Sequence, residues 1–134
     1  MNFSGVWKLI RGESDFGFLP PPRLRIDTIV QHEQQLQIST RQKDANGSIT
    51  VERNLEIGGG PTQILIHGRP RMIRAYLDGP QLVIETLSEV SGTSRRIEDR
   101  WSLDDMGQWL TIARMHEQPG GAVHQRLRLR REGL

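Results

Sequence analysis

The sequence predicts an all-β protein, folded as a single antiparallel up-and-down barrel of about ten strands. Three observations lead to this fold class. Apolar and polar residues alternate along most of the chain, which is the pattern of strands with one buried face. Turn-forming stretches such as "DANG" (44–47), "DG" (78–79) and "PGG" (119–121) separate these segments. No segment carries an apolar stripe of helical spacing and length.

The first candidate strand is "FSGVWKL" (3–9), in which Gly5 and Trp7 share a face with Phe3 and Leu9. Nine more follow, at 24–31, 36–40, 49–57, 64–66, 72–77, 81–87, 96–103, 108–115 and 123–130. Closing such strands into a barrel removes the exposed sheet edges that invite aggregation. Glycine within a strand suits a bend or a close approach of backbone. We therefore expect Gly5 and Trp7 to form a structural plug at one barrel end.

Between the first two strands lies a proline-rich insertion, "GESDFGFLPPP" (12–22). Three consecutive prolines fix the backbone and remove its donors, so this segment is neither an interior strand nor an ordinary helix. We expect a stiff loop that acts as a partial lid, in which Phe16, Phe18 and Leu19 cover apolar surface.

Length and composition narrow the classes of function. The 134 residues predict one domain, 1–134, with a net charge of +2 spread along the chain and no cysteine. We therefore expect no nucleic-acid partner, no disulfide, no cofactor and, without a run of ~18 apolar residues, no membrane insertion. The N-terminus lacks the signal-peptide pattern, which predicts a cytoplasmic protein, or an exported one if a leader has been removed.

Polar residues in phase with the predicted inward faces are candidates for ligand contact. Arg53 and Asp99 are expected to pair with each other or to contact water or a ligand, because an unpaired buried charge is costly. Arg74 and Tyr76 form a second in-phase pair, and Thr86 is a further polar position. The alternative is that a bulge shifts the register and turns such residues outward. The predicted ligand-binding set is Arg53, Arg74, Tyr76, Thr86, Asp99, Phe16 and Phe18.

Catalytic and metal motifs are missing from the sequence. No Gly-x-Ser-x-Gly elbow occurs, and the acidic residues show no arrangement typical of glycosidases. The four histidines lack the spacing of a metal motif, although His116 and His124 flank the last hairpin. The sequence thus predicts a protein that is not an enzyme and has no metal site.

The opening "FSGVWKL" resembles the start of the calycin superfamily, in which a Gly-x-Trp on the first strand seals the barrel base. Length and strand number are similar to those of the fatty-acid-binding proteins, whose two-helix lid stands where this chain has the proline-rich loop. Those proteins hold a ligand carboxylate with an Arg and a Tyr on the last strand. Arg126 and Arg128 match these positions, but alternation with Leu127 and Leu129 predicts that both face outward.

The closest resemblance is to a group of uncharacterised bacterial lipocalin-like proteins. It is carried by "SGVWKL", "SDFGFLPPP", "YLDGPQLVIET", "EDRWSLDDMGQWLTI" and a basic final strand. What the resemblance implies is a barrel that binds a small molecule inside.

Two hypotheses of function follow. In the first, the barrel binds a small hydrophobic or amphipathic ligand without catalysis, between apolar walls formed by Leu24, Ile26, Ile38, Val51, Leu82 and Ile84. In the second, the barrel is packed solid and serves protein interaction or homodimerisation. Apolar residues on predicted outer faces favour the second, namely Val6, Ile29, Ile73 and Val83. Both a monomer and a homodimer are compatible with the sequence.

Overall fold

A computed structural model describes residues 2–133 and contains ten strands and one short 3₁₀ turn. The elements are β1 (Gly5–Leu9), η1 (Arg11–Glu13), β2 (Leu24–His32), β3 (Gln35–Asp44), β4 (Gly47–Glu56), β5 (Thr62–Ile66), β6 (Arg69–Asp78), β7 (Gln81–Val90), β8 (Thr93–Leu103), β9 (Trp109–Gln118) and β10 (Gly121–Arg131). They form one antiparallel sheet in the order β4-β3-β2-β1-β10-β9-β8-β7-β6-β5. The predicted all-β, up-and-down arrangement is confirmed.

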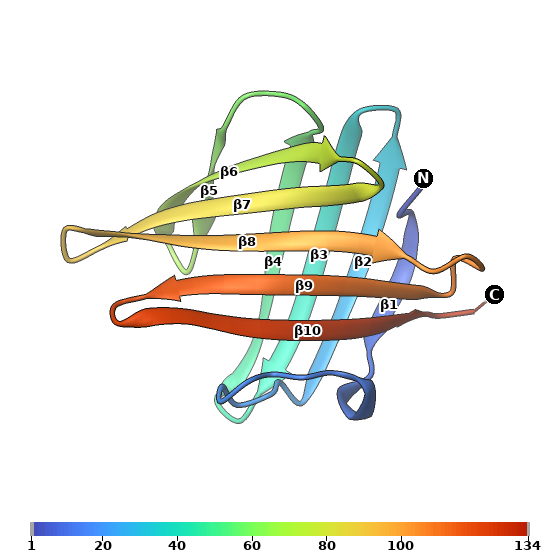
Figure 1. The fold of residues 1–134 in the computed structure, drawn as a ribbon, viewed down its shortest axis with the longest axis horizontal. Coiled ribbons are helices and arrows are strands. Elements are labelled where there is room, and N and C mark those ends of the chain that lie inside the picture. The colour runs from blue at the N-terminus through green and yellow to red at the C-terminus, as the bar shows by residue number, and fades with distance from the viewer. Residues whose placement is uncertain (1, 134) are drawn as a thin grey trace.

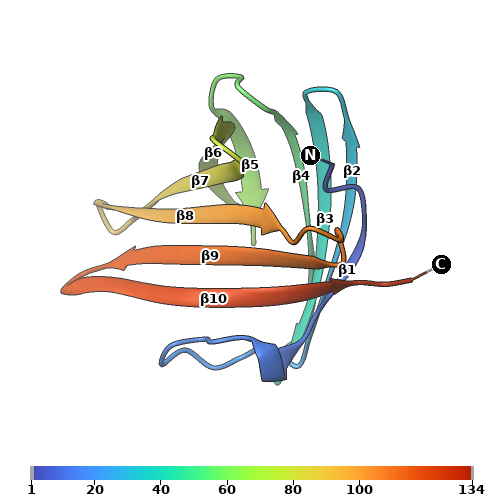
Figure 2. The same cartoon turned by 45° about the vertical axis from the view of Figure 1, so that its right-hand side comes forward.

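The sheet folds back on itself into two layers. Strands β6 to β10 run across the front of the molecule, and β2 to β4 cross behind them at a steep angle (Figure 1). The turned view in Figure 2 shows β1 beside β2, at the side where the two layers join. Consistent with this, β1 is hydrogen-bonded to β2 on one side and to β10 on the other.

The barrel is nearly, but not fully, closed. Strands β4 and β5 are the two ends of the hydrogen-bonded order. The chain just beyond β4 instead contacts β6, where Ile57 forms a bridge with Ala75 and the backbone N–H of Gly58 donates to the Ala75 carbonyl at 2.8 Å. Closure therefore depends on a local contact and not on a full ladder.

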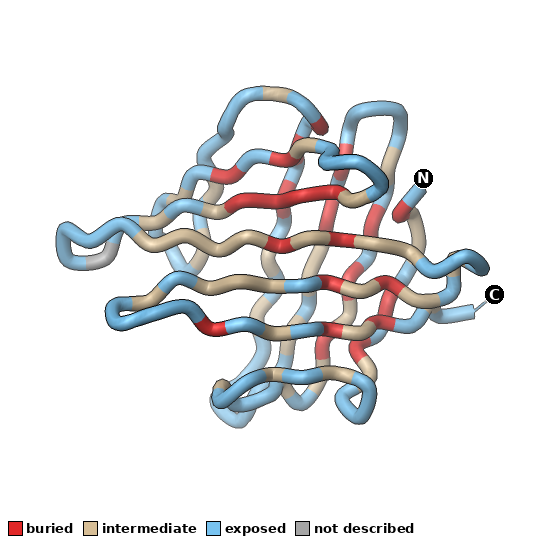
Figure 3. The backbone as a smooth tube through the Cα atoms, viewed as in Figure 1, coloured by how far each residue is buried: buried red, intermediate tan, exposed pale blue. Residues whose placement is uncertain are grey.

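The predicted faces are right for most strands, as the alternating burial in Figure 3 shows. Strands β2 and β6 are the exceptions, because β2 buries Arg25, Asp27 and Ile29, and β6 buries Ile73 and Ala75. Leu24 and Ile26 thus lie on the outer face, and their predicted place in the interior wall is wrong. An ion pair between Arg25 and Asp27 makes this polar burial possible, which the apolar pattern alone does not reveal.

The outer-face assignments also need correction. Ile29 and Ile73 are both 1% exposed and belong to the interior core. Val83 does alternate with inward Leu82 and Ile84, yet it is fully buried. Only Val6 is exposed, at 38%. Three of the four residues that favoured a packed interaction module are therefore buried, whereas other apolar side chains, such as Met72, Leu77 and Leu87, are exposed.

Candidate functional site

One half of the barrel interior is packed with apolar side chains. Trp7 and Trp101 are fully buried there, and the Phe3 ring meets Trp101 edge-on with centroids 5.6 Å apart. The indole N–H of Trp7 donates to the Phe3 carbonyl at 2.9 Å. Leu82 and Ile84 also belong to this core, as does Ile38. These three predicted wall residues therefore fill space and do not line a cavity.

A cation covers the Trp7 ring in this half. The guanidinium of Arg131 lies 4.3 Å from the ring centroid and donates to the Ser4 carbonyl at 2.6 Å. Gly5 has a φ of 142°, and a Cβ at this position would collide with the Arg131 guanidinium. Glycine is needed here for the backbone conformation and for the close approach of Arg131.

The other half of the interior is polar and holds a cavity of about 300 Å³ between the two layers. Aliphatic side chains supply part of its wall, namely Ile49, Val51, Ile66 and Ile97. Charged and hydroxyl side chains supply the rest, including Arg25, Arg53, Arg71, Thr86, Asp99 and Arg114. The structure thus brings three of the predicted site residues, Arg53, Thr86 and Asp99, to one cavity.

Two ion pairs neutralise part of this charge. Arg114 on β9 donates to both oxygens of Asp99, at 2.8 and 2.9 Å, and Arg25 donates to Asp27 at 3.0 Å. Burial acts to raise the pKa of Asp99, but the charge and hydrogen bonds of Arg114 outweigh it and leave that pKa below its ordinary value. Both carboxylates therefore already have a cationic partner.

Arg53 has no such partner. It is 9% exposed and donates to the Thr40 hydroxyl at 3.1 Å, while its Nε is buried without a hydrogen-bond partner among the described residues. Of the alternatives expected for Arg53 and Asp99, the direct ion pair is not formed, because Arg114 occupies both Asp99 oxygens. Contact of Arg53 with water or a ligand stays a prediction. Burial lowers the pKa of Arg53 to about 10, so the side chain remains a cation at neutral pH.

The proline-rich loop covers a second hollow of about 210 Å³, lined by Phe16, Leu19, Pro20 and Pro22. This hollow shares Arg25, Gln42, Ile97 and Arg114 with the larger cavity, so the two adjoin. The loop is fixed to β10 because Asp15 and Arg126 exchange two backbone hydrogen bonds of 2.8 Å.

Phe18 does not join this lining. It lies in the turn closed by the Leu19 N–H and the Phe16 carbonyl, and it is 78% exposed. Its predicted place in the lid is therefore wrong. Gly17, with a φ of 63°, turns the chain at this point.

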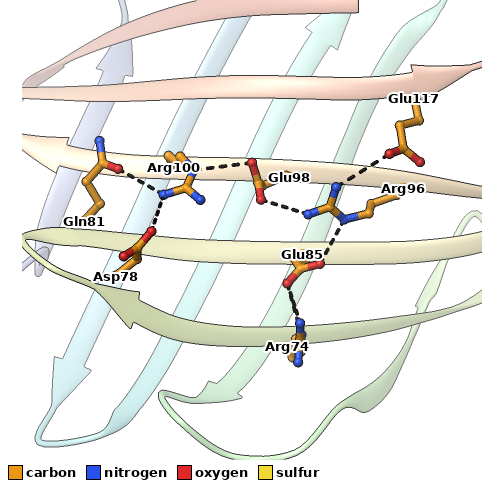
Figure 4. A network of polar contacts seen from close by, with 8 residues as sticks. All are labelled: Arg74, Asp78, Gln81, Glu85, Arg96, Glu98, Arg100 and Glu117. Atoms are coloured by element: carbon orange, nitrogen blue, oxygen red, sulfur yellow. Dashed lines mark hydrogen bonds and ion pairs between the residues drawn. The ribbon is translucent and has the colours of Figure 1, made fainter. Parts of the chain in front are cut away.

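Arg74 and Tyr76 lie on the outer face, so their predicted inward orientation is wrong. The inward positions of β6 are occupied by Ile73 and Ala75. Arg74 donates to Glu85 at 2.7 Å and stacks over the Tyr76 ring at 5.2 Å. Figure 4 shows Glu85 joined to Arg96 as well, in a network that continues through Glu98 to Arg100. Arg74 of β6 and Glu85 of β7 are therefore paired with each other on the outer face of the barrel.

Some site residues escaped the sequence analysis. Arg25 is in the wrong phase for the apolar pattern of its strand. Arg114, however, continues the inward series of Leu110 and Ile112, and this spacing could have revealed it. Arg71 lies two residues before inward Ile73, but the sequence analysis placed Ile73 on the outer face, so the pattern of this strand hid Arg71.

The last strand follows the prediction. Arg126 and Arg128 alternate with buried Leu127 and Leu129, and the Arg128 guanidinium stacks on Trp109 at 4.6 Å. His116 pairs across the last hairpin with Val123, which directly precedes His124, so the two histidines lie on opposite faces of the hairpin.

Among residues 2–133 no group of three or more His, Cys, Asp or Glu side chains is placed to hold a metal ion. No helix in the described part of the chain is long and apolar enough to cross a membrane.

Comparison with known proteins identifies the fold. No protein-family model and no curated sequence matches the chain. Among solved structures, a secretory abundant heat soluble protein from Ramazzottius varieornatus superposes with a TM-score of 0.74 and 11% identity, covering 96% of this chain and 94% of that one.

Two further structures are similar over almost their whole length. Zebrafish ileal bile acid-binding protein, complexed with cholic acid, gives a TM-score of 0.67 at 12% identity, with 97% and 98% of the two chains covered. Fatty-acid-binding protein 1 of Echinococcus granulosus gives 0.69 at 9% identity, with 98% of each chain covered. The chain therefore has the calycin-like barrel fold of the fatty-acid-binding proteins.

Proposed function

We propose that the protein binds a small amphipathic anion in the polar half of its barrel and does not catalyse a reaction. The observation that carries this proposal is Arg53. Its side chain is nine-tenths buried, it lines the cavity, and its Nε has no hydrogen-bond partner among residues 2–133. A buried cation without a carboxylate partner is costly, and an anionic ligand group would supply both the charge and the missing acceptor.

The remaining cavity wall suggests how such a ligand is oriented. Ile49, Val51, Ile66 and Ile97 offer aliphatic surface next to Arg53 and Thr86. A cavity of about 300 Å³ lies at the lower end of the usual range for ligand pockets. We infer that the anionic group lies against Arg53 and that a short apolar tail contacts these aliphatic residues.

Other predicted site residues take supporting roles in this proposal. Asp99 positions Arg114 through two hydrogen bonds, and Phe16 covers the adjoining hollow beneath the proline-rich loop. Two of the similar structures have names that mention amphipathic acids, one a fatty acid and the other cholic acid. These names support the ligand class proposed for this chain, while the ligand itself is open.

Displacement of a fluorescent anion tests the proposal. The delipidated protein would be loaded with anilinonaphthalene sulfonate and titrated with decanoate, which has a ten-carbon tail. We expect saturable displacement by decanoate and none by decyltrimethylammonium, the cation of the same tail length. Failure of the wild-type protein to bind either anion would contradict the proposal.

A pair of variants locates the site. Arg53→Gln removes the buried charge and should weaken decanoate binding by about 10- to 100-fold, as expected for loss of a hydrogen bond to a charged group. Arg100→Gln changes a partly exposed arginine of the outer network and should leave binding unchanged. Equal losses in both variants would indicate that the anion binds outside the barrel.

Two earlier expectations remain predictions alongside this function. One is homodimerisation, although the residues that suggested it expose little apolar surface; measuring the mass of the protein in solution tests it. A cytoplasmic location likewise remains a prediction.

A further inference from the structure

The polar half of the barrel contains more positive charge than its aspartates can balance. Five arginines face inward there, and two of them are paired with aspartates, Arg25 with Asp27 and Arg114 with Asp99. The other three are Arg53, Arg71 and Arg95. Within residues 2–133, none of these three takes part in an ion pair. Three guanidinium groups of the interior thus lack a direct ion-pair partner, and the carboxylates of Asp27 and Asp99 act on Arg53 only through their charge.

These three arginines lie on different strands that converge on the polar half. Arg53 on β4 and Arg71 on β6 both line the 300 Å³ cavity. Arg95 on β8 is in phase with inward Ile97 and Asp99 and lines a separate hollow beside Glu117. Among the described residues its Nε is buried without a hydrogen-bond partner, as is the Nε of Arg53. Two inward donors therefore lack an acceptor, and they come from opposite layers of the barrel.

His116 on β9 links these arginines electrostatically. Its pKa is lowered, first by burial and then by the charges of Arg114, Arg95 and Arg71. Arg114 in turn acts on Arg53. Arg71 and Arg95 therefore act on the same side chain, His116, together with Arg114.

We propose that the anionic group bound in this barrel is a phosphate monoester, recognised as a dianion. The inference rests on the proposed function and specifies its ligand class. A carboxylate has one charge and two acceptor oxygens, enough for Arg53 but not for Arg71 and Arg95. A phosphate monoester has a charge between −1.5 and −2 near neutral pH and three acceptor oxygens. Arginine forks match phosphate oxygens in geometry as well as charge.

Calorimetric titration separates this inference from the proposed function. Decyl phosphate, decanoate and inorganic phosphate would each be titrated into the delipidated wild-type protein at about pH 7.5, where the phosphate is mostly dianionic. We expect decyl phosphate to bind at least about tenfold more tightly than decanoate, since it engages more charged donors. Inorganic phosphate should bind at least about 100-fold more weakly than decyl phosphate, because it cannot use the aliphatic wall.

Each other outcome has a definite meaning. Decanoate binding as tightly as decyl phosphate would overturn the phosphate inference and leave the proposed function standing. Binding of neither amphiphile would overturn both. Inorganic phosphate matching decyl phosphate would overturn the assignment to an amphiphilic phosphate and assign the site to free phosphate.

Variants test whether the extra arginines provide the selectivity. Arg71→Gln and Arg95→Gln should each reduce the preference for decyl phosphate over decanoate by about 3- to 10-fold, while decanoate affinity stays within about threefold of wild type. Arg100→Gln on the outer face is the matched control and should leave the preference unchanged. Urea unfolding of every variant confirms the folded state. If Arg71→Gln and Arg95→Gln weaken both ligands by the same factor, the inference is wrong, because the residues then act only through structure.

Discussion

Replacing Arg53 by methionine is expected to stabilise the ligand-free protein while removing its ligand binding. Arg53 is buried, makes one hydrogen bond to Thr40 and has no carboxylate partner in the described structure. Methionine has a similar length and fills the same space without a charge. A functional residue of this kind lowers the stability of the protein that carries it.

The magnitude can be worked out from the ionisation of Arg53. Its pKa is lowered to about 10, against about 12.5 for an arginine in water, and one pKa unit corresponds to ~1.4 kcal/mol. Holding the charge inside the barrel therefore costs on the order of 3 kcal/mol. The lost hydrogen bond to Thr40 offsets about 1 kcal/mol of the gain. We expect Arg53→Met to raise the free energy of unfolding by about 1–3 kcal/mol.

Urea unfolding followed by tryptophan fluorescence measures this change, provided that the slope with urea stays the same in both proteins. Arg25→Met is the matched control, because its guanidinium pairs with the fully buried Asp27. Removing that partner should destabilise the protein by about 3–5 kcal/mol. A decrease in stability of 1 kcal/mol or more in Arg53→Met, of the order of a lost hydrogen bond, would refute the reasoning about an uncompensated charge.

Three further changes have clear expected results. Gly5→Ala should lower the free energy of unfolding by about 1–3 kcal/mol, through backbone strain and the collision with Arg131. The loss should be smaller when Arg131 is also alanine, because only the backbone strain then remains. Asp99→Asn should destabilise the protein at pH 7, by leaving Arg114 unpaired. The lowered pKa of Asp99 means that its ion pair stabilises the protein above about pH 4 and that this stabilisation is lost as the pH falls. Urea unfolding at acid pH should therefore show a smaller difference in unfolding free energy between Asp99→Asn and the wild-type protein. Phe18→Ser should change stability by less than about 0.5 kcal/mol, because its ring is exposed.

Alternation and turn residues were sufficient for the fold. Each turn marks where one strand ends and the next begins, so ten antiparallel strands in up-and-down order could be predicted. The "DANG" turn illustrates this, since Asp44 and Gly47 close the β3–β4 hairpin and the Asp44 carboxylate accepts the Asn46 N–H at 2.8 Å. These are local effects, and local sequence describes them well.

The site was less predictable because its faces are set by partners distant in sequence. Leu24 and Ile26 satisfy an apolar pattern, yet the ion pair of Arg25 and Asp27 makes the opposite face the buried one. Arg74 appears inward only if Glu85 on the next strand is ignored. Periodicity shows that a strand has two faces, but when both carry charged residues the cross-strand partners decide which face is buried.

The central claim is that Arg53 receives the anionic group of a ligand inside the barrel. The ¹H–¹⁵N spectrum of the arginine Nε groups tests it most directly, with the Arg53 signal assigned by its absence in Arg53→Gln. Adding decyl phosphate should move the Arg53 signal downfield, because a phosphate oxygen then accepts a hydrogen bond from its Nε–H. The Arg100 signal of the outer network should stay in place. An unmoved Arg53 signal at saturating decyl phosphate would contradict the account.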